Sequence, residues 1–225
     1  MFNRPIEEIT NASGLRGKAK IAELALGYNG GPAALIKMGA LRMGMSEDEL
    51  PGLVSTWRKA NPMIVRYWKA VENAAIEAVE NPGEKVKLAN ISFQVSNDHL
   101  FITLPSGRKL SYVKPRLKPG KFGGYALTYE GTDQNTKQWK RLDTYGGKLV
   151  ENIVQAIARD LLAEAMLRLD AAGYDIVMHV HDETVTEGHE SQIHTINQLM
   201  AVKPDWAQTL PLGAEGYATK YYRKD

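Results

Sequence analysis

The 225-residue sequence contains no cysteine, which excludes disulfide bonds and zinc sites built on thiolates. No apolar run approaches the roughly 20 residues that a membrane-spanning helix needs. The first residues, Met1 to Glu8, carry charge before any apolar core, so they do not form a secretory signal peptide. Internal repeats, low-complexity tracts and flexible linkers are also missing. These absences predict a folded protein of a reducing cytoplasm, without a membrane partner.

The charges of the chain are nearly balanced, because it has 28 lysines and arginines and 26 acidic residues, which gives a net charge of +2. That excess is too small to predict that the whole chain is drawn to nucleic acid. The distribution is more informative, since the segment Ser106 to Lys121 holds six basic residues and no acidic one. Arg108, Lys109 and Lys114 in this segment can contact a phosphate backbone. A solvated basic loop is the alternative.

An apolar fraction of 44% is enough for a hydrophobic core, and the length allows one large domain or two small ones. Helical and strand periodicities both occur along the chain. Helices are predicted at residues 15–26, 32–42, 47–59, 62–81, 148–172 and 190–200. Strands are predicted at residues 85–95, 99–104, 108–113, 125–129, 138–142, 176–178, 184–186 and 210–217.

Two of these helices carry apolar side chains at helical spacing, which predicts the sides that face the core. On the helix that starts at residue 62 they are Ile64, Trp68, Val71, Ala75 and Ala78. On the longest helix, apolar surface is provided by Leu149, Ile153, Ala156, Leu161, Ala163 and Leu167.

The helix at residues 15–26 has two faces of different character. The apolar face consists of Leu15, Ala19, Ala22 and Leu26. Arg16 and Lys20 lie one turn apart on another face, so their cationic ends project side by side. Such a pair can grip a polyphosphate, and a solvated basic face is the alternative. The glycine-rich segment from Gly27 to Pro32 ends the helix.

Two short arms rich in β-branched residues, at 176–178 and 184–186, flank the polar triplet His181-Asp182-Glu183. This pattern predicts a buried hairpin with a histidine and two adjacent carboxylates at its tip. Buried carboxylates are costly unless they are paired, hydrogen-bonded or bound to a metal. The tip is therefore either a polar turn or a divalent-metal site that handles phosphate.

Three motifs stand in a fixed order: Arg16-x3-Lys20-x7-Tyr28, then Gln155-Ala-Ile-Ala-Arg-Asp-Leu-Leu in the long helix, then His181-Asp-Glu183. Together they resemble the C-terminal half of a family A DNA polymerase, of the DNA polymerase I type. The segments at 105–112 and 210–216 look like the bacteriophage and prophage members of that group. The resemblance covers nearly the whole chain, and the combination of the motifs makes it specific.

The resemblance assigns roles in binding nucleotide and DNA. Arg16 and Lys20 match residues of the fingers helix that hold the triphosphate of the incoming deoxynucleotide. Tyr28 matches a tyrosine at the end of that helix, which stacks at the templating position. Gln155 matches a glutamine that contacts the duplex minor groove near the primer terminus. The implied partners are primer–template DNA and deoxynucleoside triphosphates.

The resemblance also assigns the chemistry of the hairpin tip. His181 matches a histidine near the primer end, Asp182 a catalytic metal ligand, and Glu183 the adjacent acid with a more auxiliary role. The implied reaction adds deoxynucleotides to a primer 3′ end by phosphoryl transfer with two Mg²⁺ ions. Cations on the fingers helix neutralise the charge that builds on the phosphates.

This sequence departs from the family pattern in three places. Leu24 stands where the family usually has an aromatic residue near the sugar of the nucleotide. Asn29 stands where glycine usually follows the tyrosine, and asparagine tolerates the left-handed backbone of such a turn. No segment before Arg16 resembles the strand that carries the second catalytic aspartate, and the thumb is missing.

The resemblance therefore divides the chain into a helical fingers subdomain and part of a palm, and the fold class that it implies is α+β. Residues 1–145 are the predicted fingers, with helices at about 15–82 and a β-rich return at about 85–145. Residues 146–225 are the predicted C-terminal part of the palm, with a long helix and antiparallel strands. Such a chain is expected to be inactive alone and to need an N-terminal partner with the other aspartate and the thumb. The Met1 start favours a split polymerase over an arbitrary fragment, in the bacterial host cytoplasm if a phage encodes it.

Other interpretations stay open. The pair His179 and His181, followed by Asp182, is also typical of a metal-dependent hydrolase. A non-catalytic DNA-binding accessory protein derived from a polymerase would keep the basic surface while the metal site decays. RNA polymerases of the same superfamily are a further possibility, although Glu183 after the aspartate resembles the DNA enzymes.

Overall fold

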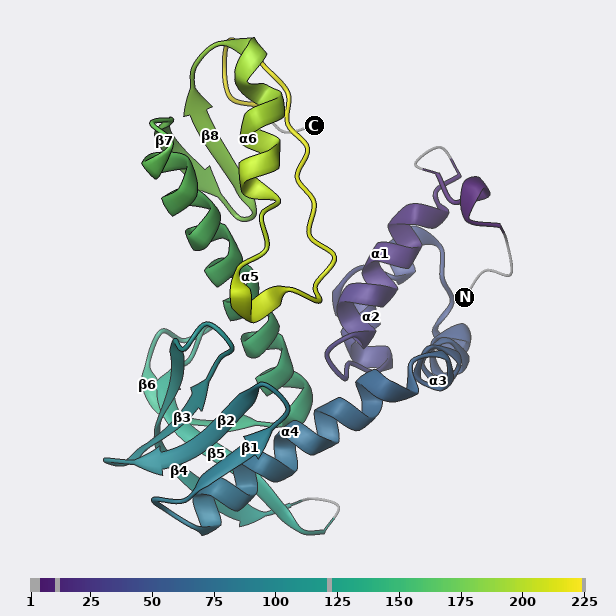
Figure 1. The fold of residues 1–225 in the computed structure, drawn as a ribbon. Helices are drawn as coiled ribbons and strands as arrows, with labels where there is room; N and C mark the ends of the chain where they lie inside the picture. The colour runs from purple at the N-terminus through teal and green to yellow at the C-terminus, as the bar shows by residue number, and fades with distance from the viewer. Residues whose placement is uncertain (1–4, 11–12, 121–122, 224–225) are drawn as a thin grey trace. The chain divides into compact units, whose positions relative to one another are not determined.

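The structure is a computed structural model that describes residues 5–10, 13–120 and 123–223. Contacts divide the chain into two compact units. The first unit falls within residues 1–102 and 109–152, and the second within residues 103–108 and 153–225. Figure 1 labels the helices and strands of both units.

The first unit begins with helical segments. They are η1 (Ile6–Glu8), α1 (Leu15–Leu26), α2 (Pro32–Lys37), η2 (Leu41–Met43), η3 (Glu47–Glu49), α3 (Leu50–Ala60) and α4 (Pro62–Glu80), where η marks a 3-10 helix. The prediction of α1 is confirmed at both ends. The helix predicted at 32–42 ends early, because Gly39 takes a φ of 97° that breaks the helical path. The helix predicted from Glu47 starts as η3, where Ser46 N donates to Glu49 Oε2 at 2.9 Å in a capping box.

The buried side of α4 agrees with the sequence pattern at all predicted positions except one. Trp68, Val71, Ala75 and Ala78 are buried. Ile64 is 36% exposed, so its predicted burial is wrong. It lies in the first turn of the helix, where a side chain has helical neighbours on one side only.

A six-stranded sheet follows α4, with its strands in sequence order. The strands are β1 (Lys85–Leu88), β2 (Ile91–Ser96), β3 (His99–Thr103), β4 (Lys109–Pro119), β5 (Tyr125–Thr132) and β6 (Trp139–Thr144). Residues 85–95, predicted as one strand, form the hairpin β1–β2, in which Leu88 pairs with Ile91. In the turn between them, Ala89 has a φ of 50°. Alanine rarely adopts a positive φ, so the sequence did not indicate this turn. The predicted hairpin of 125–129 with 138–142 is confirmed as β5–β6.

Helix α4 lies against this sheet and contacts β1, β2, β4 and β5 (Figure 1). The sheet contributes the fully buried side chains Phe93, Leu100 and Ile102, and α4 contributes Val71. Each such large apolar side chain stabilises the fold by about 1.5–3 kcal/mol. The first unit therefore has a core of its own between a helix and a sheet.

Helix α5 (Gly146–Ala171) is the longest helix and continues from the first unit into the second. Its predicted core residues Leu149, Ile153 and Ala156 are buried. Further along, the buried residues are Leu162, Ala165 and Leu169. Of the other residues predicted to provide apolar surface, Leu161 and Ala163 are partly buried, whereas Leu167 is 68% exposed. Leu162, Ala165 and Leu169 follow one another in steps of three and four residues, as one side of a helix requires, and Leu167 lies off that side.

The second unit adds β7 (Asp175–Val180), β8 (Glu183–Glu187), η4 (Glu190–Gln192), α6 (Ile193–Met200) and η5 (Asp205–Ala207). Arg168 on α5 donates to Leu199 O at 3.1 Å and to Val202 O at 2.9 Å, so a cation closes the C-terminal end of α6. Residues 210–217, predicted as a strand, form no regular element, because proline and two glycines interrupt them. Among the described helices, none is long and apolar enough to cross a membrane.

Candidate functional site

Arg16 and Lys20 project from one ridge of α1. Both side chains are exposed, whereas the opposite side of the helix buries Ala22 and Leu26. The structure therefore brings the two cations together, one turn apart, as their spacing predicts. Leu24 continues the ridge and is 47% exposed. The α1 ridge, defined as Arg16, Lys20 and Leu24, presents two cationic side chains and one apolar side chain to solvent.

Tyr28 is half-buried in the turn that follows α1. Asn29 adopts a φ of 65°, so the prediction that asparagine sustains a left-handed turn here is confirmed. Gly30 N donates to Ala25 O at 3.0 Å, and a Cβ at Gly30 would lie 2.2 Å from that oxygen. Only glycine fits this close approach. We call residues 27–30 the Tyr28 turn.

Asp182 and Glu183 lie at the tip of the antiparallel hairpin β7–β8. Val180 pairs with Glu183, which leaves His181 and Asp182 as the two residues of the turn. His181 has a φ of 54°. This conformation costs a residue other than glycine about 1–2 kcal/mol, and such strain is concentrated at functional sites.

The hairpin is exposed, which corrects the prediction of a buried one. His181, Asp182 and Glu183 are all exposed, and Val177 on β7 is 54% exposed. β-branched residues indicate a strand, but the same residues occur on exposed and on buried faces. Because these carboxylates are not buried, the cost of burying charge is no argument for a metal site here. A metal site can be argued only from the kind of donor atoms at the tip.

Glu183 has a hydrogen-bond partner that the sequence did not indicate. Tyr222 Oη in the C-terminal segment donates to Glu183 Oε2 at 3.0 Å. Desolvation raises the pKa of Tyr222, and the hydrogen bond and negative charge of Glu183 raise it further. The phenol therefore stays protonated and keeps donating at neutral pH. No local motif links two residues that lie 39 positions apart.

The donor atoms at the tip suit Mg²⁺, which prefers carboxylate oxygens and retains several water ligands. Asp182 and Glu183 supply two adjacent, solvent-facing carboxylates. Within the described ranges, no three His, Asp or Glu side chains form a group that could hold a metal ion. Proteins commonly hold Mg²⁺ with one or two carboxylates together with substrate phosphates. The tip therefore fits part of a magnesium site.

Arg108, predicted to contact DNA, forms an ion pair with α5. Its Nε donates to Asp160 Oδ1 at 2.5 Å, and its Nη2 donates to Ala156 O at 2.8 Å. Ser106 Oγ donates to the other carboxylate oxygen of Asp160, also at 2.5 Å. Asp160 is 8% exposed, so this acid needs these donors. The Arg108 side chain thus anchors the turn before β4 to α5.

Lys109 and Lys114 on β4 are exposed, and each has a partner within the chain. Lys109 Nζ lies 5.5 Å from the centre of the Phe101 ring, and Lys114 Nζ lies 3.3 Å from Glu130 Oε2. Desolvation alone would raise the pKa of Glu130, but hydrogen bonds from Lys114 and Trp139 and the nearby cations lower it overall. Part of the positive charge is therefore offset, and contact of these lysines with DNA stays a prediction.

The predicted site residues are divided between the two units. The first unit holds Arg16, Lys20, Tyr28, Lys109 and Lys114, and the second holds Arg108, Gln155, His181, Asp182 and Glu183. Gln155 is exposed on α5, as a contact with DNA requires. Lys121, at the end of the basic run, lies outside the described residues.

The chain is 53% identical over 229 aligned residues to a protein named DNA polymerase from Bacillus phage SP02. The match covers 100% of this chain and 35% of that polymerase, so the chain spans about a third of the length of its relative. No protein-family model matches the chain, and no solved structure matches it. The chain is thus related to a region of a phage DNA polymerase, whereas its placement in family A stays a prediction.

Proposed function

We propose that the chain is part of a template-directed DNA polymerase that adds deoxynucleotides to a primer 3′ end. The observation that carries this proposal is the 53% identity to a phage DNA polymerase, which extends over the whole chain and so over both units. In this proposal, residues 1–145 form the fingers subdomain of a family A polymerase. Residues 146–225 form the C-terminal part of its palm.

The α1 ridge is the proposed site for the triphosphate of the incoming nucleotide. The planar guanidinium of Arg16 can bind phosphate oxygens in pairs, and the ammonium of Lys20 acts as a compact point charge beside it. Both side chains face solvent, so a nucleotide can reach them without rearrangement of α1. Charge that develops on the phosphates during the reaction is then met by cations already in place. Tyr28, at the end of the same helix, is the proposed stacking partner of the templating base.

The hairpin tip is the proposed catalytic part. Asp182 would hold Mg²⁺ with help from Glu183, and the bound ion would supply Lewis-acid stabilisation of the phosphoryl oxygens. Tyr222 holds Glu183 through its hydroxyl, so one carboxylate oxygen of Glu183 is fixed in direction. His181 and the exposed Gln155 are the proposed contacts with DNA near the primer end, and Arg108, Lys109 and Lys114 are proposed contacts with its phosphates.

We further propose that a separate N-terminal polymerase segment completes the site with the second aspartate and the thumb. The match covers only 35% of the phage relative, so most of that polymerase has no counterpart here. The β7–β8 sheet has two strands, and an isolated pair of strands is marginal in water. Val177 and Met178 on β7 are 54% and 37% exposed. This apolar surface is the proposed contact for the missing segment.

Primer extension tests this function. The chain alone is expected to extend no primer, whereas its mixture with the unmatched part of the phage relative extends a primer as the template directs. Extension in the mixture that requires both components would support the proposal. Retention of DNA without any extension would instead identify a non-catalytic DNA-binding protein.

A further inference from the structure

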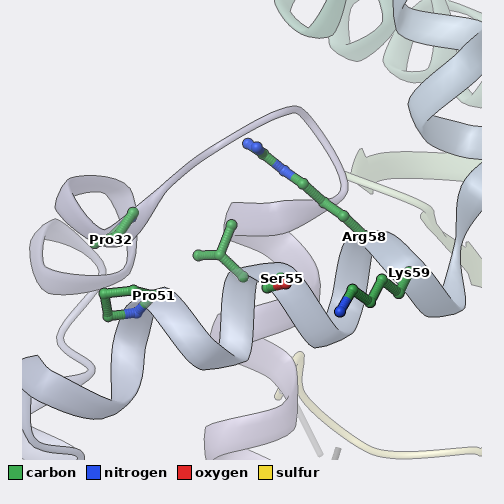
Figure 2. A pocket seen from close by; sticks show the side chains of 6 residues that line it. Pro32, Pro51, Ser55, Arg58 and Lys59 are labelled. Carbon is green, nitrogen blue, oxygen red and sulfur yellow. The ribbon is translucent and has the colours of Figure 1, made fainter.

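The Tyr28 turn is held by an arginine that no sequence motif singles out. Arg58 on α3 donates from Nη2 to Asn29 Oδ1 at 3.1 Å and to Gly30 O at 3.2 Å. Figure 2 shows its extended side chain rising from α3 towards the neighbouring loop, beside a groove lined also by Pro51 and Lys59. One guanidinium nitrogen therefore bonds both a side chain and a backbone carbonyl of the turn.

Two tryptophans hold the end of α1 that leads into this turn. Trp68 Nε1 donates to Gly27 O at 3.0 Å, and Trp57 Nε1 donates to Glu23 Oε2 at 2.8 Å. The two indole rings stack, with centroids 6.0 Å apart and planes 6° from parallel. Both are buried, so their positions are fixed by the core. The carbonyl of Gly27, which the helix itself leaves unpaired, is thus satisfied by α4.

The start of α5 also lies close to the turn. A Cβ at Gly147 would lie 2.4 Å from Tyr28 O and 2.5 Å from Asn29 Cβ. These distances are too short for any residue with a side chain, which accounts for the glycine at this position. The backbone of Tyr28 is therefore confined by α5 as well as by Arg58.

The way Arg58 is bound indicates more than a contribution to stability. Its Nε is buried and has no hydrogen-bond partner among the described residues. Leaving a buried donor unpaired is costly, so a residue kept only for packing would be apolar. Asn29, which the guanidinium binds, takes a left-handed backbone beside Tyr28. The unpaired donor therefore belongs to the side chain that binds this turn.

We infer that Arg58 is a positioning residue that fixes the Tyr28 turn and thereby sets how the templating base is presented. The inference rests on the proposed function, because it takes Tyr28 as the stacking partner of that base. Arg58 itself touches neither the nucleotide nor the metal site in this scheme. It acts through Asn29 and Gly30, which lie directly after Tyr28.

Hydrogen exchange on the chain alone tests the structural half. In Arg58→Ala, the amide of Gly30, which bonds Ala25 O, is expected to exchange at least tenfold faster, while the amides of β5 are unchanged. Lys59→Ala is the matched control, because Lys59 is the next residue, is exposed and lines the same groove. Unchanged exchange at Gly30 in Arg58→Ala would overturn the inference, whether or not the chain is a polymerase.

Fidelity of the assembled polymerase tests the functional half. Arg58→Ala is expected to lower the ratio of kcat/KM for the correct over the incorrect nucleotide at least tenfold, and Arg58→Lys to restore part of that ratio. If Arg58 had a purely structural role, Arg58→Ala would lower kcat/KM equally for both nucleotides. The ratio would then stay unchanged, and this result would overturn the inference. Failure of the wild-type assembly to extend any primer would instead count against the proposed function, and the exchange result would then decide on the role of Arg58 in the turn.

Discussion

Lys20 can be substituted to test the proposed nucleotide contact without disturbing the core, because its side chain faces solvent. Lys20→Gln is expected to raise the KM for deoxynucleoside triphosphates about tenfold or more, since a hydrogen bond to a charged group is worth about 1.5–3 kcal/mol. Steady-state primer extension by the assembled polymerase measures this. Lys37→Gln, at the exposed end of α2, is the control and is expected to leave KM unchanged. A normal KM in Lys20→Gln would remove the α1 ridge from the nucleotide site.

Tyr112 makes the stability of the first unit depend on pH. Burial raises its pKa to about 12, a hydrogen bond from Asn152 to its oxygen opposes this, and Tyr129 nearby adds to the rise. The folded state favours the neutral phenol, so the contribution is complete below the unfolded pKa of about 10 and is lost as pH rises from there towards 12. Two pKa units correspond to about 3 kcal/mol at most.

Tyr112→Phe tests this dependence, because phenylalanine keeps the ring and removes the titrating hydroxyl. The free energy of unfolding of the wild type is expected to fall more steeply above about pH 10 than that of the variant. Urea unfolding at a series of pH values measures both slopes. Equal slopes would show that Tyr112 ionises as easily in the folded chain as in the unfolded one.

At the scale of elements, Asp160 ties the turn between β3 and β4 to α5. Asp160→Ala removes the acceptor of Ser106 and Arg108. The free energy of unfolding is expected to fall by about 2–3 kcal/mol, since hydrogen bonds to a charged group contribute about 1.5–3 kcal/mol. Urea unfolding followed by circular dichroism measures it. Asp170→Ala, exposed on the same helix, is expected to cost less than about 0.5 kcal/mol, and equal losses would contradict the role of the buried acid.

Helices were predicted correctly where the sequence has a local signal for their start or end. α1 was predicted because its apolar side chains recur at helical spacing and a glycine-rich segment follows it, and the helix start at η3 because Ser46 and Glu49 form a capping box. The β1–β2 turn was missed, because Ala89 takes its positive φ from the pairing around it. The exposure of Leu167 on α5 has a similar cause, since only the tertiary contacts select which side of a helix that is apolar around much of its surface is buried.

The candidate site was predictable only where its residues lie close together in the sequence. The α1 ridge and the hairpin tip are local patterns, and the structure brings each together as predicted. Arg58 and Tyr222 were not found, because an arginine in a helix and a tyrosine near a C-terminus have no pattern of their own. Their roles come from contacts over 29 and 39 positions.

At the scale of the whole molecule, the exposed apolar side of the hairpin predicts an association. Val177→Glu is expected to weaken binding to the proposed N-terminal segment about tenfold or more, because burial of such a side chain is worth about 1.5–3 kcal/mol. Titration calorimetry measures the affinity. The unfolding free energy of the chain alone is expected to stay unchanged, since Val177 is 54% exposed.

The control for this association is Val202→Glu, at a valine that is 44% exposed after α6. It introduces the same charge at a comparable apolar position outside the hairpin. If Val177→Glu and Val202→Glu weaken binding equally, charge alone is responsible and the hairpin is not the contact. If neither does, the segment binds elsewhere.

Asp182 is the proposed catalytic ligand in a polymerase assembled from this chain, and single-turnover incorporation with Mg²⁺ tests this role most directly. Asp182→Asn keeps the shape of the side chain and removes its charge, so the rate is expected to fall at least about 10³-fold. Asp175→Asn, exposed at the other end of the hairpin and paired with Glu187, is expected to react at the wild-type rate. A near-normal rate in Asp182→Asn, or an equal loss in Asp175→Asn, would contradict the assignment of Asp182.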